Sequence, residues 1–325
     1  MTKKSIIIRC CDEEEHIGRL LAGICQQTES EHEIILVDSG STDATLAIAS
    51  RYPVKIISIK RDDFSFGYSL NVGCEAASGD FIVVVSAHTY PVHQDWLEKL
   101  LAPFEDERVG LTYGKQRGNG STKYSEQRIF EKWFPDQSNA NQEHPFCNNA
   151  NAAVRKDLWQ RFRYNESLTG LEDIAFAHQL VGAGYKVAYQ AEAEVIHVHD
   201  ESWRALFNRY RREAIALKEI FPHERFRFFE FFHMLTKNIC GDLLQSLKDR
   251  VFLHNLRLIV MFRLMQFWGT YRGYGQHGAI SRQLKEKFYY PNETGILNRK
   301  SVTQRSERSV IDYSELEDEQ TKKDH

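Results

Sequence analysis

Along the first 110 residues, apolar positions follow two alternating patterns, one typical of buried strands and one typical of amphipathic helices. Short apolar runs predict strands over residues 5–9, 33–37, 54–59 and 81–85. Helical periodicity fills the intervals between them, over residues 14–28, 44–51 and 68–77. Strands that alternate with helices favour a mostly parallel, doubly wound sheet with helices on both faces, so the predicted fold class is α/β.

The middle of the chain has a weaker pattern, in which glycine and asparagine residues mark loops between residues 114 and 146. One amphipathic helix is predicted there, over residues 124–134. Beyond it, the sequence predicts a strand, two helices and two final strands, over residues 151–154, 156–160, 173–182, 186–189 and 195–198. We therefore expect one α/β domain over residues 1–200.

The sequence changes character after residue 201, where three helices rich in Phe, Leu and Met also carry arginines. They are predicted over residues 202–221, 225–247 and 251–271. Such a surface suits a membrane interface, packing on the α/β domain, or a second subunit in a homodimer, and the sequence leaves these alternatives open. We place this helical region at residues 201–297 and expect the polar, charged tail at residues 298–325 to be disordered.

The composition narrows the class of protein. A net charge of −3 lacks the basic footprint of a nucleic-acid binder, so no nucleic-acid partner is expected. The six cysteines form no Cys-x-x-Cys, which favours reduced thiols over a zinc site. The apolar run after Lys4 is too short for a signal-peptide core, and no stretch of about 18 apolar residues exists. We therefore expect a cytoplasmic protein without a membrane-spanning helix.

Polar and charged side chains gather after the first two predicted strands. Arg9, Asp12 and Glu13 end or follow the first strand, and Asp38 and Ser39 follow the second. Open parallel sheets bind nucleotides where such strand ends meet. Asp38 is therefore a candidate to accept hydrogen bonds from a base or ribose, with a turn cap as the alternative. Asp12 and Glu13 suit the same pocket or a solvated helix start.

Two adjacent carboxylates, Glu172 and Asp173, stand at the start of the helix predicted over residues 173–182. They suit a general base, because a neighbouring like charge raises the pKa of a carboxyl group toward the working range. The alternative is a pair of acids that favours the helix macrodipole. On the residues alone, the second role is favoured.

Five short strings in a fixed order resemble the motifs of family-2 inverting glycosyltransferases, which have the GT-A fold, a Rossmann-like α/β architecture. The strings occupy residues 6–14, 37–43, 67–73, 147–155 and 170–173. Two later segments, His197-x-His199 and Arg209-Tyr210-x-Arg212, are similar to the region after the last strand in bacterial rhamnosyltransferase-like members. The resemblance covers roughly residues 5–215.

The chain departs from the family at one motif. After the strand that ends near residue 85, members normally carry Asp-x-Asp, which holds a divalent metal on the donor diphosphate. This chain has Ser86, Ala87 and His88 there, so both carboxylates are absent. Mg²⁺ prefers oxygen ligands, whereas imidazole suits Mn²⁺ better. His88 can bind such a metal with His197 or His199, or bind the phosphate directly, and the metal requirement stays open.

The resemblance implies a cytoplasmic enzyme, peripheral to the inner face of the cell membrane. It implies transfer of a sugar, with inversion, from a nucleotide-sugar donor to a hydroxyl of a glycan or lipid-linked acceptor in bacterial surface-polysaccharide synthesis. In this reading Asp173 is the general base, and Glu172 is its charged neighbour. The implied donor-binding residues are Arg9, Asp12, Glu13, Asp38, Ser39, Asn71, Ser86 and His88. The candidates for the acceptor site are Trp133, Asn148 and Asn149.

The sequence also allows a second class of function. Loss of Asp-x-Asp fits a catalytically degenerate protein that binds sugars or scaffolds a glycan assembly complex, whereas the retained Asp173 disfavours it. A nucleotidyltransferase would usually carry a glycine-rich, basic phosphate loop after the first strand, and residues 10–16 contain no such loop.

Overall fold

The computed structural model describes residues 3–142, 144–277 and 309–313. Within these ranges, nine strands form one sheet in the order β3-β2-β1-β4-β8-β6-β9-β5, with β7 paired to β9. The strands are β1 (Lys4–Cys10), β2 (His32–Asp38), β3 (Val54–Ser58), β4 (Phe81–Ser86), β5 (Thr89–Pro91), β6 (Val109–Arg117), β7 (Asn139–Gln142), β8 (Asn151–Arg155) and β9 (Lys186–His197).

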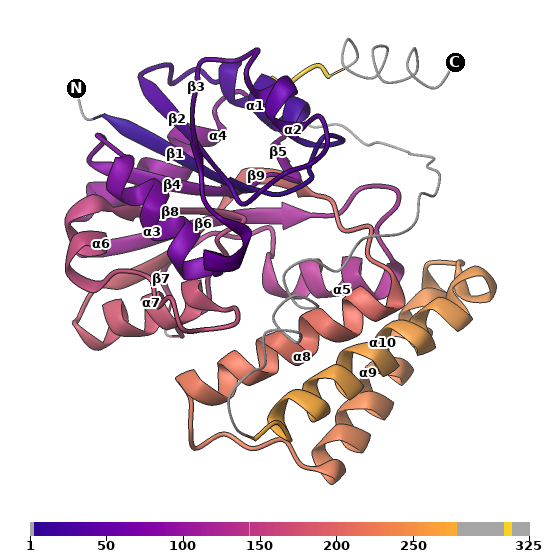
Figure 1. Ribbon diagram of the computed structural model, residues 1–325. Coiled ribbons are helices and arrows are strands. Elements are labelled where there is room, and N and C mark those ends of the chain that lie inside the picture. The colour runs from indigo at the N-terminus through magenta and orange to yellow at the C-terminus, as the bar shows by residue number, and fades with distance from the viewer. Residues whose placement is uncertain (1–2, 143, 278–308, 314–325) are drawn as a thin grey trace.

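Helices cover both faces of this sheet and continue beyond it. They are α1 (Ile17–Cys25), α2 (Thr45–Ala49), α3 (Phe66–Ala76), α4 (Trp96–Leu101), α5 (Tyr124–Trp133), α6 (Lys156–Phe162), α7 (Glu172–Gly182), α8 (Trp203–Ile220), α9 (Phe228–Lys248) and α10 (Phe252–Tyr274). In Figure 1, α8, α9 and α10 lie together at one side of the α/β domain, with α5 between them and the sheet.

The sheet has a parallel half and a mixed half. Strands β3, β2, β1 and β4 pair in parallel, and their register sets Cys10 opposite Asp38 and Arg9 opposite Ser86. The carboxyl ends of these strands therefore meet at one edge. Strand β8 runs antiparallel to β4 and β6, and β9 returns parallel to β6. The predicted α/β class is confirmed, with antiparallel strands added beyond β4.

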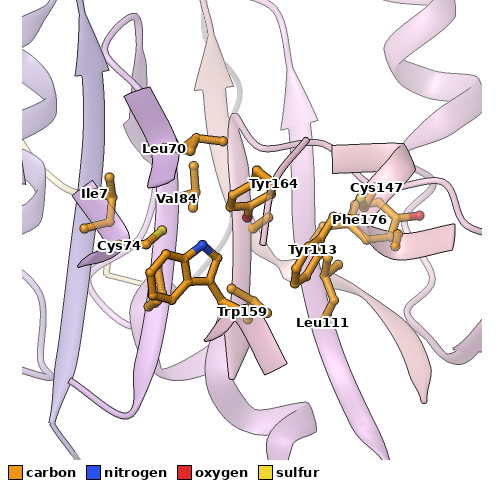
Figure 2. Packing of buried hydrophobic residues seen from close by; sticks show 14 of the residues in the cluster. Ile7, Leu70, Cys74, Val84, Leu111, Tyr113, Cys147, Trp159, Tyr164 and Phe176 are labelled. Atoms are coloured by element: carbon orange, nitrogen blue, oxygen red, sulfur yellow. The ribbon is translucent and has the colours of Figure 1, made fainter. Parts of the chain in front are cut away.

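The core consists of two apolar layers, one on each face of the sheet. Alternation along β1 sends Ile7 into one layer and Ile6 and Ile8 into the other. Figure 2 shows the first layer, in which Ile7 lies near Val84 and the side chains of α3. The second layer packs under α1 and α4. Because both faces are covered, the parallel strands are continuously apolar, as the sequence predicted.

The predicted elements reappear in the structure with shifted ends, and four elements were missed: α4, β5, β6 and β7. Strand β6 was missed because glycines interrupt its apolar pattern. At Gly114, a Cβ atom would lie 2.2 Å from the main-chain oxygen of Ala193, so the close approach of β9 requires glycine there.

The two final strands predicted over residues 186–189 and 195–198 are one strand, β9. The prediction divided it at the polar residues Gln190, Glu192 and Glu194. These positions alternate with Ala191, Ala193 and Val195, which are all buried. A period of two on a half-covered strand therefore explains the polar residues without a break.

Three helices form the C-terminal region, as predicted. Helices α8 and α10 cross closely, because glycine at position 269 lets the main-chain oxygen of Phe207 approach to 2.5 Å from where a Cβ would lie. A buried ion pair fixes the hairpin of α9 and α10: the Nε of Arg263 donates to Asp242 at 2.7 Å. The same carboxylate accepts from the Oγ of Ser125 in α5, at 2.6 Å. These bonds join the hairpin to the α/β domain.

The tail predicted to be disordered, residues 298–325, is described in the structure only over residues 309–313. Within residues 309–313, Ile311 is buried and the hydroxyl of Tyr313 donates to the main-chain oxygen of Pro91 at 2.7 Å. The remainder of that prediction lies outside the described residues. Among the helices of the described chain, none is long and apolar enough to cross a membrane.

We predict that Asp242→Asn lowers the free energy of unfolding by about 3–5 kcal/mol, because it leaves a buried guanidinium without its counter-charge. Urea unfolding followed by tryptophan fluorescence measures this loss. Asp157→Asn, at an exposed position of α6, is the control and should cost less than about 1 kcal/mol. Equal losses for the two variants would contradict a structural role for the ion pair.

Candidate functional site

The loops after β1 and β2 are hydrogen-bonded to each other at the carboxyl edge of the sheet. The Oδ1 of Asp12 accepts from the main-chain N–H of Thr42 at 2.7 Å, and the main-chain N–H of Asp12 donates to the Oγ of Ser41 at 3.0 Å. Asp12 has a φ of 53°, which a residue other than glycine seldom adopts. Its side chain is exposed, so the loop presents a carboxylate to solvent at this edge.

Asp38 and Ser39 are turned into the protein. The carboxylate of Asp38 is 2% exposed and accepts from the main-chain N–H of Gly40 and from the N–H and Oγ of Ser41. The Oγ of Ser39 donates to the main-chain oxygen of Cys10 at 3.2 Å. These bonds shape the turn that follows β2, and contact of either side chain with the donor stays a prediction.

Asn71 is likewise an internal residue. Its Nδ2 donates to the main-chain oxygen of Tyr164 and to Glu166, at 2.9 and 2.8 Å. Its Oδ1 accepts from the Nε1 of Trp159 and the main-chain N–H of Tyr164, at 3.0 and 3.1 Å. All four hydrogen-bonding positions of the amide are thus filled within the protein, and its role in donor binding stays a prediction.

Three histidines meet beside the end of β4. Strand β5 pairs antiparallel with β9 so that Thr89 lies opposite His197, which brings His88 next to it. The rings of His88 and His197 stack with centroids 5.0 Å apart, and the Nε2 atoms of His197 and His199 are 2.9 Å apart. Each of the three offers a ring nitrogen within 4.8 Å of the others. We call these residues the histidine cluster.

Acceptor oxygens behind the rings set the orientation of two of these histidines. The Nδ1 of His197 lies 2.7 Å from the Oε1 of Gln116, and the Nδ1 of His199 lies 2.7 Å from the Oε1 of Glu126. A carbonyl or carboxylate oxygen can only accept, so each Nδ1 carries the proton. In the neutral rings the lone pairs are then on the Nε2 atoms, which face each other.

The charge state of the cluster follows from its surroundings. Burial, aided by the neighbouring histidines, holds the pKa of His197 well below its usual value, so this ring is neutral. Burial alone would raise the pKa of Glu126, but His199 and Arg209 outweigh it and lower that pKa to about 2. For His88, burial opposes protonation, yet Glu13 at 2.8 Å prevails and raises its pKa.

Two facing lone pairs 2.9 Å apart suit one shared proton or one shared cation. Three imidazoles form a donor set that fits late divalent transition metals and Mn²⁺ better than Mg²⁺. Histidine ligands typically hold their other ring nitrogen on an acceptor, as found here. A second group is formed by Glu126, His199 and Glu201. Its negative charge is already balanced by Arg209, which donates to both carboxylates at 2.6 and 2.8 Å.

The acidic pair predicted from the sequence, Glu172 and Asp173, lies close to the carboxyl edge of the sheet. Glu172 is 3.2 Å from the Nη1 of Arg9, whose strand pairs with Ser86. Asp173 is 8% exposed, and its Oδ2 accepts from the main-chain N–H of Asn149 at 3.0 Å. Burial and then the charge of Glu172 raise the pKa of Asp173 to about 7. Asp173 can therefore gain or release a proton near neutral pH.

Asn149, which contacts both residues of the acidic pair, follows an exposed aromatic stack in the chain. Trp133 is 40% exposed and stacks on Phe146, with ring centroids 4.5 Å apart. Phe146 precedes Asn148, whose Oδ1 caps its own turn, and Asn149, which is buried. Among the described residues, the Oδ1 of Asn149 has no hydrogen-bond partner. An exposed ring and an unused amide oxygen suit a polar, ring-shaped ligand.

Comparison with known proteins identifies the family of the N-terminal half of the chain. The family model described as Glycosyl transferase family 2 matches residues 5–162. These residues belong to glycosyltransferase family 2. The resemblance inferred from the motifs is thereby confirmed, and the motifs matched at residues 6–14, 37–43, 67–73 and 147–155 all lie inside the matched range.

Proteins similar to this chain include two from Salmonella. The O-antigen chain rhamnosyltransferase WbaN of Salmonella anatum is 30% identical over 197 residues, which are 57% of this chain and 62% of the relative. The O-antigen chain rhamnosyltransferase RfbN of Salmonella typhimurium is 29% identical over 204 residues, with coverages of 59% and 65%. The chain thus spans less than two thirds of the length of these relatives.

A solved structure gives the fold of the chain an independent match. The mannosyltransferase PcManGT from Pyrobaculum calidifontis, in complex with GDP-Man and Mn²⁺, superposes with a TM-score of 0.57 at 17% identity. The match covers 89% of this chain and 88% of PcManGT. At this identity the likeness shows the fold alone, and it confirms the predicted GT-A architecture.

The sequence missed the residues that surround the histidine cluster. Gln116 lies in the unpredicted strand β6, and Glu126 lies in the polar helix α5. Arg209 was compared with the family motif but given no role. Glu126 is 3% exposed although it is charged. The sequence pattern does not distinguish a buried acid in a polar helix from an exposed one. These contacts depend on tertiary structure.

We predict that Asp173→Asn changes how stability depends on pH. The pKa of Asp173 is raised from 3.8 to about 7 on folding, so the native state retains a proton that the unfolded chain has lost between these values. Stability of the natural chain therefore falls as pH rises from about 4 to 7, and the variant escapes this loss. Urea unfolding should show its relative stability rising by something on the order of 3 kcal/mol over this interval.

The hydrogen bond that the variant loses to Asn149 shifts its stability equally at every pH, so only the slope is tested. Asp157→Asn, at an exposed position of α6, is the matched control. Its stability relative to the natural chain should not change with pH. Parallel curves for the natural chain and Asp173→Asn would contradict the raised pKa.

Proposed function

We propose that this family 2 protein is an inverting glycosyltransferase that moves a sugar from a nucleotide-sugar donor to a hydroxyl of a glycan or lipid-linked acceptor. One observation carries the proposal. A buried carboxyl group with a near-neutral pKa, Asp173, is linked through Glu172 to Arg9, which pairs in register with Ser86 beside the histidine cluster. A base and a phosphate-binding edge are therefore within one small site.

Asp173 acts as the general base in this proposal. Its carboxylate takes the proton of the acceptor hydroxyl while that oxygen attacks the anomeric carbon from the face opposite the leaving group. The bond from the anomeric carbon to the diphosphate oxygen breaks, the nucleoside diphosphate leaves, and the sugar carbon inverts. A pKa near 7 suits such a base. Main-chain N–H groups of Asn149 and Ile174 hold its two oxygens in place.

The donor lies along the carboxyl edge of the sheet in this proposal. Arg9, Ser86 and His88 face its diphosphate, where fixed donors stabilise the charge that develops on the leaving group. Asp12 and Glu13 lie at the same edge, in reach of the nucleoside. The acceptor lies toward Trp133, Asn148 and Asn149, with its ring on the exposed indole.

We include a divalent cation in the proposed site, because PcManGT was solved with Mn²⁺ and GDP-Man. His88, His197 and His199 would hold it in this chain. When bound, such an ion supplies positive charge next to the leaving diphosphate. The nature of the ligands favours Mn²⁺ over Mg²⁺.

The biological setting of the proposal comes from the relatives. Two of them are named O-antigen chain rhamnosyltransferases, which supports a role in bacterial surface-polysaccharide synthesis at the cytoplasmic side of the membrane. Because Asp-x-Asp is missing, one alternative function stays open, namely that of a degenerate sugar-binding or scaffold protein. The two differ in whether any donor is turned over.

We predict that Asp173→Asn lowers transfer by about 10²–10⁴-fold, because an amide cannot take the proton. The measurement is release of nucleoside diphosphate from UDP-, GDP- and dTDP-sugars, with lipid-linked glycans from bacterial membranes as acceptors. Donor affinity should stay unchanged, which calorimetry checks. Asp157→Asn is the control and should transfer at the natural rate. Natural activity in Asp173→Asn would refute the base, and absence of turnover and donor binding in the natural chain would favour the scaffold.

A further inference from the structure

Helices α9 and α10 present large apolar side chains to solvent. Leu253 is 89% exposed and Phe229 is 81% exposed, and four neighbours on the hairpin are more than half exposed. We call these six residues the apolar hairpin face: Phe228, Phe229, Phe232, Leu244, Leu247 and Leu253. Phe228, Phe229 and Phe232 lie near the start of α9, whereas Leu244, Leu247 and Leu253 lie near the turn into α10. Exposed large apolar side chains in such number on one hairpin indicate an interaction surface.

The apolar hairpin face follows the helical period on the outer side of the hairpin. In α9, Phe229, Phe232 and Leu247 fall on one side, whereas Phe231 is buried on the other. Both sides of this helix are therefore apolar, which packing against α10 alone does not explain. The buried bond between Asp242 and Arg263 fixes which side points inward, so rotation of the helix cannot hide the outer side.

The charges around this face are mainly of one sign. Between residues 224 and 257 the exposed basic residues are Arg225, Arg227, Lys237, Lys248, Arg250 and Arg257. The exposed acidic residues of the same segment are Glu224, Glu230 and Asp249. Pairing of this face with a second copy would bring mostly like charges together, whereas an anionic surface would attract them.

We propose that the apolar hairpin face lies in the interface of an anionic lipid bilayer. Phenylalanine and leucine side chains enter the boundary between headgroups and acyl chains, and the basic residues contact lipid phosphates. Contact is shallow, since no helix in the described part of the chain can span a bilayer. This binding does not depend on the proposed function, because it requires no donor and no turnover.

The hairpin also fixes how the site stands relative to the bilayer. Asp242 of α9 bonds to Ser125 of α5, and the next residue of α5, Glu126, holds His199 of the histidine cluster. A docked hairpin therefore holds the site at a set distance from the lipid surface, through one short helix.

Co-sedimentation of the full chain with vesicles tests the proposal. We expect binding to vesicles of phosphatidylglycerol and phosphatidylcholine, weak binding to phosphatidylcholine alone, and weaker binding at high salt. The double variant F229S/L253S should lose about tenfold or more in affinity for the anionic vesicles, because two exposed apolar anchors are removed. The variant K237Q/R257Q should lose affinity at low salt, with less effect at high salt.

Val310→Ser is the matched control, since Val310 is 51% exposed on the α/β domain, away from the hairpin. It should bind vesicles like the natural chain. Circular dichroism and melting temperature establish that each variant folds. Failure of the natural chain to bind anionic vesicles overturns the proposal. If ultracentrifugation then shows a dimer that F229S/L253S dissociates, a second copy covers the face instead.

Discussion

The antiparallel register of β5 on β9 is the constraint on which the candidate site depends. It sets Thr89 opposite His197, so His88, one residue earlier, lies against the ring of His197. Side chains of a strand alternate between its faces. A shift of β9 by one residue would therefore turn His197 to the other face and separate it from His88. Strand β9 is held in turn by β6, which supplies Gln116 behind the same ring. The cluster is thus a product of strand pairing.

Electrostatic environment, more than burial, separates the roles of the acidic groups. Glu126 and Asp173 are both buried, yet their pKa values move in opposite directions. Glu126 is bonded to Arg209 and His199, which keep it ionised as a fixed support. Asp173 accepts hydrogen bonds from main-chain N–H groups and lies beside Glu172, so its proton is retained to about pH 7. Placing two carboxyl groups in unlike surroundings is a common way to divide such roles.

Sequence patterns sufficed for the α/β architecture and for the grouping of polar residues at one sheet edge, because period and strand polarity alone determine both. They did not indicate that the side chains of Asp38, Ser39 and Asn71 bond inward, because whether a polar group turns inward depends on partners such as Tyr164, far along the chain. Gln116 and Glu126 were missed for the same reason. The nearness of His88, His197 and His199 was anticipated only through the family resemblance.

The most direct test of this account is a crystal structure of the full chain with Mn²⁺ and a nucleoside diphosphate, recorded at the manganese absorption edge. The account predicts an anomalous peak within bonding distance of the Nε2 atoms of His197 and His199 and of a ring nitrogen of His88, next to the bound diphosphate. A diphosphate bound at this edge with the metal held elsewhere, or with a proton shared between the two Nε2 atoms and no metal, would contradict it.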